Sequence, residues 1–183
     1  GKLARRAACT TGKGRLLFRL ANYFEPGITL ELGTSLGLSG LYLMKGYHKT
    51  RLYTMEGCPN LARLARDNFA RFGLHPQICT GNISKKLPEL LHNLPAPLDM
   101  VYFDANHRYT PTMQYFELCL SKAHENSVFI FDDINWSAPM AQAWRAIQKH
   151  HKVTLSIDLY HCGLVFFRKK QPRQHFRLRF KGW

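Results

Sequence analysis

The sequence predicts an α/β fold in which a mostly parallel sheet of seven strands, the last of them antiparallel, carries helices on both faces. Two observations predict it. Short apolar runs that suit buried strands alternate five times with helical segments, which is typical of a parallel sheet. After the fifth repeat, two further strand-like runs are separated by only the four residues 160–163, too few for a parallel crossover. They must therefore pair as an antiparallel hairpin.

The expected strands are short, rich in β-branched and aromatic residues, and bounded by turn residues. In chain order they are residues 28–32, 51–55, 76–80, 98–103, 127–131, 153–159 and 164–167.

The expected helices place apolar residues three and four positions apart. This spacing is clearest in the segment that ends before Gly73, a residue typical of the position just past a helix end. One face of that helix carries Leu61, Leu64, Ala65, Phe69 and Phe72. Ser137 and Pro139 predict the start of the last helix. The expected helices are residues 13–24, 35–47, 61–72, 83–94, 109–123 and 137–147.

We expect a single domain in three parts, since 183 residues with 45% apolar content can bury a sizeable core. Residues 1–27 form a helical segment that packs on the domain, residues 28–170 form the α/β domain itself, and residues 171–183 form a basic tail. The chain begins with Gly rather than Met, so we expect a trimmed N-terminus or a fragment.

Several function classes are disfavoured by composition. No apolar run approaches the roughly 20 residues that span a bilayer, and the first residues lack the apolar core of a signal peptide, so we expect no membrane association. The five cysteines are odd in number and lack C-x-x-C spacing, which argues against a disulfide framework and a zinc site. Reduced thiols predict a cytoplasmic protein.

The net charge of +14 gathers at the two ends of the chain. A charge of this size attracts nucleic acid, anionic lipid or an acidic substrate. Solvated termini of a basic protein explain the pattern equally, and both interpretations stay open.

The first strand ends in an acid and a glycine turn, Glu31-Leu32-Gly33-Thr34-Ser35-Leu36-Gly37. Such a turn lets the backbone pass close to a ligand and enter the next helix. An acid there suits a ligand with hydroxyl or ammonium groups and suits a phosphate poorly. Ser35 stands where a dinucleotide fingerprint has its second glycine, so that pattern is not met. An ordinary strand-to-helix turn is the alternative.

Acidic residues collect at the carboxyl ends of the expected strands, where open α/β sheets bind ligands. Of only 12 acids in the chain, five lie there, which predicts one acidic pocket fitted to a cationic ligand. Glu56 follows Gly33 by 23 residues, at the end of the second strand, where a carboxylate can accept hydrogen bonds from ribose hydroxyls. The five acids are Glu31, Glu56, Asp104, Asp132 and Asp133.

The E-x-G-x-x-x-G motif, the strand–helix alternation and the closing hairpin together resemble class I S-adenosylmethionine (SAM)-dependent methyltransferases over almost the whole chain. The resemblance implies a Rossmann-like seven-stranded sheet with SAM as cofactor. It assigns the methionine part of SAM to Glu31 and the Gly33–Gly37 backbone, and the adenosine to Gly57, Cys58, Gly81 and Asn82. The complete set that it implies for the cofactor is Glu31, Gly33, Thr34, Ser35, Gly37, Glu56, Gly57, Cys58, Gly81, Asn82, Asp104 and Asn106.

The segment Val101-Tyr102-Phe103-Asp104-Ala105-Asn106-His107 resembles catechol- and caffeoyl-CoA-type O-methyltransferases, in which a lysine follows the aspartate by three residues. Here His107 holds that position. Histidine can take a proton from a hydroxyl near neutral pH, so we expect Asp104 and His107 to be catalytic. His107 as a loop residue or a cofactor contact is the alternative. Bacterial O-methyltransferase-like proteins with Asp-x-Asn-His and Asp-Asp-Ile-x-Trp-Ser segments resemble the chain more closely still.

In that family an Asp-Asn pair after the fifth strand and the strand-four aspartate bind a magnesium-type cation. The resemblance places this site at Asp104, Asp132 and Asp133, whose oxygens suit hard cations. In this chain the second residue of the pair is Asp133 rather than Asn, and His107 replaces the lysine. Metal-dependent and metal-independent reactions therefore both stay open.

We therefore expect methyl transfer from SAM to an oxygen of a small molecule. Trp136, Trp144 and Tyr109 are candidates for the acceptor pocket, although aromatic residues at helical spacing also suit a core. The alternatives are an RNA or DNA methyltransferase, suggested by the charge, and a non-catalytic SAM-binding module. No Asn/Asp-Pro-Pro-Tyr/Phe segment follows the fourth strand, which disfavours base methylation. A homodimer is also open.

Overall fold

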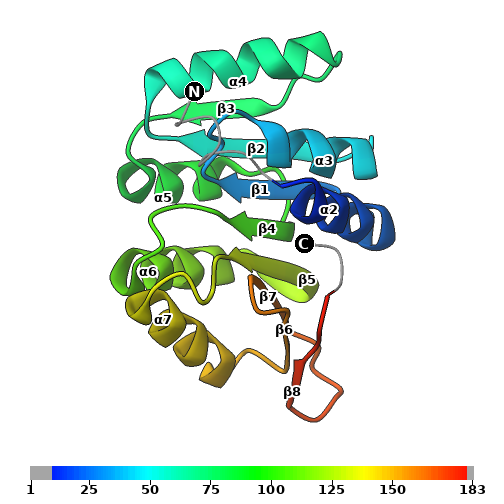
Figure 1. Cartoon of the computed structure of the whole chain (residues 1–183), viewed down its shortest axis with the longest axis vertical. Coiled ribbons are helices and arrows are strands. Elements are labelled where there is room, and N and C mark those ends of the chain that lie inside the picture. The colour runs from blue at the N-terminus through cyan, green and yellow to red at the C-terminus, as the bar shows by residue number, and fades with distance from the viewer. Residues whose placement is uncertain (1–9, 181–183) are drawn as a thin grey trace. The chain divides into compact units, whose positions relative to one another are not determined.

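The computed structural model describes residues 10–180, which divide into two compact units, residues 10–83 and residues 84–180 (Figure 1). The predictions for the first nine and last three residues lie outside the described part of the chain. Each unit is built from strands and helices in alternation, so the α/β class is confirmed.

The first unit is a three-stranded parallel sheet in the order β3-β2-β1, with three helices. Its strands pair in parallel, with Ile28 opposite Arg51 and Tyr53 opposite Gln77. In chain order its elements are α2 (Thr11–Phe24), β1 (Ile28–Leu32), α3 (Leu38–Gly46), β2 (Arg51–Glu56), α4 (Pro59–Arg71) and β3 (Gln77–Thr80).

Helix α2 packs closely on α3. The Thr10 hydroxyl caps α2 by accepting the backbone N–H of Lys13 at 3.3 Å. A Cβ on Gly14 would overlap the ring of Tyr42, so the absence of a side chain lets the two helices approach. The helix expected over residues 13–24 is therefore present and spans Thr11–Phe24.

Helix α4 forms as predicted and buries only part of its apolar face. Leu64 is 45% exposed and Phe72 is 56% exposed, whereas Ala62, Ala65 and Phe69 are buried. The buried positions follow the helical spacing of 3 and 4, and two of them are alanines that allow close packing. The large apolar residues Leu64 and Phe72 therefore lie at the exposed margin of the apolar face.

The second unit carries the remaining strands in the order β4-β5-β7-β6-β8. Strands β4 and β5 are parallel, and β7 is antiparallel to both β5 and β6, which confirms the closing hairpin. In chain order the elements are α5 (Ile83–Asn93), β4 (Leu98–Phe103), α6 (Tyr109–Leu120), β5 (Ala123–Asp132), α7 (Ala138–Lys149), β6 (Leu155–Asp158), β7 (Cys162–Phe166) and β8 (Gln174–Arg177).

The bounds predicted for two neighbouring elements of this unit, the helix over 109–123 and the strand over 127–131, were wrong. The helix expected over 109–123 ends at Leu120, and Ala123 already belongs to β5, whose pairing with β4 shifts register between Leu98 and Met100. In the basic tail, for which no strand was predicted, Gln174–Arg177 form β8 alongside β6 (Figure 1). The tail therefore adds a parallel strand beyond the seven predicted ones.

Aromatic rings fill the core of the second unit. Phe103 and Phe131 stack with centroids 4.2 Å apart, and Phe116 meets Phe131 edge-on at 5.9 Å. Such pairs contribute ~0.5–1.5 kcal/mol each beyond their burial. This packing fixes the carboxyl ends of both strands, where Asp104 follows β4 and Asp132 is the last residue of β5.

Within residues 10–180, no helix combines the length and apolar character needed to cross a bilayer. The four cysteines in this range, Cys58, Cys79, Cys119 and Cys162, are free thiols, and Cys9 lies outside it. Complete burial raises the pKa of Cys119, so its thiol stays protonated.

Candidate functional site

The glycine turn after β1 lies tightly against the end of β2. The backbone N–H groups of Gly33 and Thr34 both donate to the Met55 carbonyl at 3.0 Å. Gly33 and Gly37 adopt φ of 104° and 80°, a left-handed region open to glycine. A Cβ on Gly37 would lie 2.8 Å from the Phe69 ring. The glycines are thus needed for the turn, as predicted.

Glu31 supports this turn from beneath. Its side chain is buried, and its carboxylate accepts hydrogen bonds from the Ser39 hydroxyl at 2.5 Å and the Thr54 hydroxyl at 2.6 Å. The Thr54 hydroxyl also lies 2.6 Å from that of Thr34, inside the turn. Glu31 therefore positions the turn. Its direct contact with a ligand stays a prediction.

Glu56 joins three loops at the carboxyl ends of β1, β2 and β3. One carboxylate oxygen accepts the backbone N–H of Ser35 and the other that of Cys58, both at 2.8 Å. Its main-chain carbonyl accepts the N–H of Gly81 at 2.8 Å. Because each carboxylate oxygen has two lone pairs, both can accept a further hydrogen bond.

The first unit therefore brings together most of the residues predicted to bind the cofactor. Glu56 is partly exposed, and Gly57, Cys58 and Asn82 are exposed beside it. Thr34 is buried, and it holds the turn through the hydroxyl contact to Thr54. Ser35 adopts φ of 48°, which is uncommon for a residue with a side chain, and this strain is offset by its bond to Glu56.

In the second unit, the loop after β4 places His107 against Asp104. His107 Nε2 lies 3.4 Å from Asp104 Oδ1, and both side chains are partly exposed. Asn106 and His107 adopt positive φ of 65° and 32°. Such backbone strain in non-glycine residues concentrates at functional sites. The two residues predicted to be catalytic are thus in contact.

Asn106 is anchored from the other side. Its amide donates to the Tyr115 hydroxyl at 2.8 Å, and that hydroxyl lies 3.0 Å from the Ser84 hydroxyl. Tyr115 is buried in α6, so the loop is tied to a rigid element. Tyr115 could not be identified as a site residue from the sequence, because a tyrosine on the buried face of a helix resembles any core residue.

Asp132 ends β5, Asp133 follows it, and both add negative charge near His107. Asp132 is buried, whereas Asp133 is partly exposed and adopts φ of 52°. Burial alone lowers the pKa of His107, but the hydrogen bond to Asp104 and the charges of Asp104, Asp133 and Asp132 raise it, and the net pKa lies above the usual 6.5.

The predicted metal site does not fit the geometry. Within residues 10–180, no group of three or more His, Cys, Asp or Glu side chains is arranged to hold a metal ion. Asp104, Asp132 and Asp133 act instead as charges around His107.

Residues 30–134, more than half of the chain, match the family described as "Methyltransferase domain". The chain belongs to this methyltransferase family. Among curated relatives it is 32% identical over 125 residues to catechol O-methyltransferase of Niastella koreensis, covering 67% of this chain and 56% of the relative. It is 28% identical to catechol O-methyltransferase of Mycobacterium tuberculosis, covering 70% and 58%. The chain thus spans less than two thirds of these relatives.

Solved structures confirm the Rossmann-like methyltransferase fold. The O-methyltransferase TomG of Streptomyces achromogenes, in complex with SAM, matches with a TM-score of 0.76 and 23% identity, covering 91% of this chain and 86% of TomG. An O-methyltransferase of Bacillus cereus, in complex with SAH (S-adenosylhomocysteine), matches with a TM-score of 0.76 and 21% identity, covering 87% and 83%.

The three aromatic residues predicted for an acceptor pocket differ in exposure. Trp144 is 3% exposed, its indole N–H donates to Asp158 at 3.3 Å, and it packs on Gly163, so it is a core residue. Tyr109 is 36% exposed and Trp136 is 74% exposed. Trp136 is held near Asp133 by its backbone N–H, which donates to the Asp133 carbonyl at 2.8 Å.

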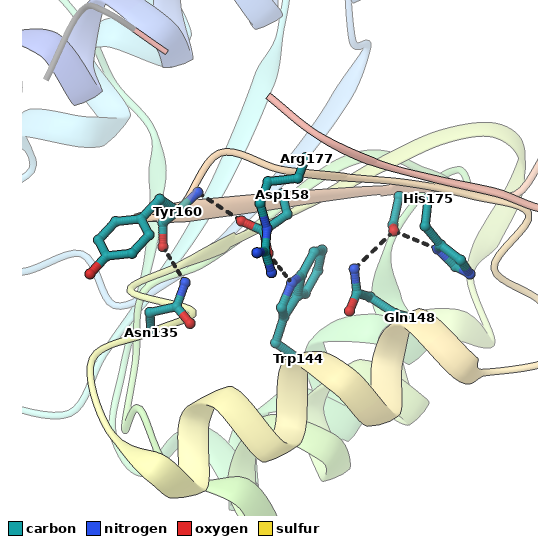
Figure 2. Close-up of polar contacts among 8 residues, drawn as sticks. Asn135, Trp144, Gln148, Asp158, Tyr160, His175 and Arg177 are labelled. Carbon is teal, nitrogen blue, oxygen red and sulfur yellow. Dashed lines mark hydrogen bonds and ion pairs between the residues drawn. The ribbon is translucent and has the colours of Figure 1, made fainter. Parts of the chain in front are cut away.

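The turn between β6 and β7 adds an aromatic residue that sequence analysis missed. Tyr160 is 64% exposed and adopts φ of 74°. Figure 2 shows how it is held: Asn135 donates to its carbonyl at 2.7 Å, and Asp158 accepts its N–H at 2.8 Å. Asn135 is the neighbour of Trp136, so one hydrogen bond ties the two loops that carry these exposed rings.

Proposed function

We propose that this chain is a SAM-dependent O-methyltransferase that acts on a small molecule. The arrangement that carries the proposal is the Glu56 carboxylate, which bridges the Ser35 turn and the Cys58 loop in a chain of the methyltransferase family. The printed names of its relatives, catechol O-methyltransferase and O-methyltransferase, and the SAM or SAH bound in solved neighbours support the same activity.

The first unit holds the methyl donor in this proposal. Glu56 accepts hydrogen bonds from the two ribose hydroxyls through the lone pairs that its backbone contacts leave. The Gly33–Gly37 backbone faces the methionine part, Gly57 and Cys58 flank the adenosine, and Gly81 with Asn82 meets the adenine edge. Glu31 acts indirectly, through Thr54 and the turn.

The second unit supplies the acid–base group. His107 Nε2 faces Asp104, so in the neutral imidazole the proton sits on Nε2 and the lone pair on Nδ1. His107 takes the acceptor hydroxyl proton on Nδ1, and Asp104 orients the ring and stabilises the imidazolium. Asp104 and Asn106 are also candidates for contact with SAM. Asn106 in addition holds the loop through its hydrogen bond to Tyr115.

SAM supplies an electrophilic methyl group on a sulfonium. The acceptor oxygen forms the new bond to the methyl carbon while the carbon–sulfur bond breaks, and its electron pair stays on sulfur. The proton of the acceptor hydroxyl goes to His107, so the charge of the sulfonium is balanced by the imidazolium. The chain contributes orientation and a base, which can supply much of the barrier reduction.

We further propose that the acceptor carries an aromatic ring bearing a hydroxyl. Trp136 and Tyr160 expose large ring faces on loops that Asn135 ties together, and flat rings of this kind stack on a planar acceptor. Catechol, the acceptor in the printed names of two relatives, has this chemistry.

A nucleic-acid methyltransferase is the second candidate, favoured by the net charge of +14 and by exposed cations at Arg168, Lys169, Lys170, Arg173, Arg177 and Arg179. A non-catalytic SAM-binding module is the third. A cytoplasmic location and a homodimer stay predictions.

Transfer of isotope-labelled methyl from SAM tests these candidates. We expect label in catechol and none in mixed RNA, with activity lost in His107→Gln but retained in His48→Gln, an exposed histidine of the first unit. Label in RNA alone would favour the second candidate. SAM binding without transfer to either acceptor class would favour the third.

A further inference from the structure

A cavity in the second unit lies away from the His107 loop. It has a volume of about 640 Å³ and is lined by the end of α6, the start of β5 and the segments after α7 and β7. The lining includes His124, His151, Lys152 and Lys169. Asp132 lies at the other end of β5, nine residues of strand away, on the order of 30 Å. The cavity is therefore separate from the His107 site.

The charges around the cavity favour an anion. Lys152 and Lys169 outweigh the one acidic residue in the lining, Glu125, and His151 adds charge when protonated. Both lysines are exposed, and among residues 10–180 neither ammonium group has an ion-pair partner. Their charge is thus available to a ligand.

A further cation, Arg173, is fixed beside the cavity. The Arg173 guanidinium donates to the carbonyls of Lys149 at 3.4 Å and His150 at 3.0 Å, at the end of α7 next to His151. The field there is positive: desolvation lowers the pKa of His150, and His151, Lys152 and Arg173 lower it further, against the raising effect of Glu117.

The walls of the cavity are of two kinds. Leu120 and Phe167 are nearly buried and give it an apolar side. His124 has a fixed ring, because Nε2 lies 3.1 Å from Asp99 and Nδ1 accepts the backbone N–H of Asn126 at 3.2 Å. The mobile donors are thus the two lysines, opposite a preformed wall. Such a mixture suits a ligand with an anionic head and an apolar body.

We propose that this cavity binds a small organic phosphate, with the phosphate held by Lys152 and Lys169 and the apolar part against Phe167. The site is independent of methyl transfer, since none of these residues belongs to the donor or acid–base machinery. We expect a ligand with a carboxylate head to bind more weakly than one with a phosphate, because a phosphate presents more acceptor oxygens and more negative charge to the two ammonium groups.

Isothermal titration with phenyl phosphate, inorganic pyrophosphate and benzoate tests the proposal in the full chain. We expect phenyl phosphate to bind most tightly and benzoate least, and binding to weaken when NaCl rises from about 50 to 200 mM. The double variant Lys152→Gln/Lys169→Gln removes both ammonium groups and should weaken phenyl phosphate binding roughly 10-fold or more.

The matched control is Lys49→Gln/Lys85→Gln, which removes the same charge from two exposed lysines outside the cavity. Circular dichroism checks that both double variants are folded. Equal weakening in the two variants would assign binding to the overall charge and overturn the proposal. So would the failure of both phosphate probes to bind the wild-type chain, and so would tighter binding of benzoate.

Discussion

The backbone N–H of Ser35 donates to the Glu56 carboxylate at 2.8 Å, across 21 residues of chain. This contact joins the turn after β1 to the end of β2, and the second carboxylate oxygen extends it to Cys58. A single acidic side chain thereby fixes the loops that we assign to the methyl donor. Since both N–H groups are satisfied by one carboxylate, its loss affects loop geometry and ligand binding together.

Replacing Glu31 tests the support beneath this turn. Glu31→Ala removes the acceptor of the Ser39 and Thr54 hydroxyls inside the core, so we expect the free energy of unfolding to fall by about 2–4 kcal/mol. Glu31→Gln keeps the volume and one acceptor oxygen and should cost less. Urea denaturation measures both. Wild-type stability in Glu31→Ala would contradict the buried role.

The pH dependence of methyl transfer tests His107. The base must be neutral, and neighbouring carboxylates raise its pKa above 6.5, so the rate should rise with pH through a value above 6.5. Asp104→Asn removes a hydrogen bond and a charge that raise the pKa, so the midpoint should move to lower pH. His107→Gln should lower the rate about 100-fold or more and abolish the rise. A rise that persists in His107→Gln would assign it to another group.

The exposed ring of Trp136 tests the acceptor assignment. Trp136→Ala should raise the KM for an aromatic acceptor roughly 3- to 10-fold, since ring stacking contributes ~0.5–1.5 kcal/mol, and leave SAM binding unchanged. Tyr23→Ala removes a ring that is 77% exposed on α2 and serves as control. An unchanged KM in Trp136→Ala, measured by steady-state kinetics, would remove Trp136 from the acceptor site.

The packing of Trp144 gives a test that does not depend on activity. A Cβ on Gly163 would overlap the indole of Trp144, which is also fixed by its hydrogen bond to Asp158. Gly163→Ala should therefore destabilise the chain by about 1–3 kcal/mol. Gly57→Ala, where a Cβ meets nothing within 4 Å, is the matched control for thermal denaturation.

Much of the fold could be predicted from the sequence because its signals are local. The strands at 28–32 and 98–103 are continuous apolar runs and have the predicted bounds. β8 could not be predicted, since all four of its residues are exposed and lack an apolar face. It is held by backbone pairing with β6 and by contacts such as His175 to Ser156 at 2.7 Å and Arg177 to Asp158 at 3.7 Å (Figure 2).

The candidate site was predictable in position but only partly in role. The predicted carboxyl ends of the strands indicated where Glu56, Asp104 and His107 would lie, because loops at these ends of parallel strands bind ligands. Sequence alone gave no sign that Glu31 is enclosed by hydroxyls, which depends on Thr54 from the neighbouring strand. Nor did it reveal Tyr160, whose exposure follows from a turn held by a distant asparagine.

Calorimetric titration of SAH into the wild type, Glu56→Gln and Glu89→Gln tests the central claim most directly. Glu89 is an exposed acid on α5, and its loss controls for the change in net charge. We predict binding to the wild type and to Glu89→Gln with similar affinity, and roughly 10- to 100-fold weaker binding to Glu56→Gln, because hydrogen bonds to a charged group are worth ~1.5–3 kcal/mol. Absence of SAH binding to the folded wild type, or equal affinity in all three proteins, would contradict the account.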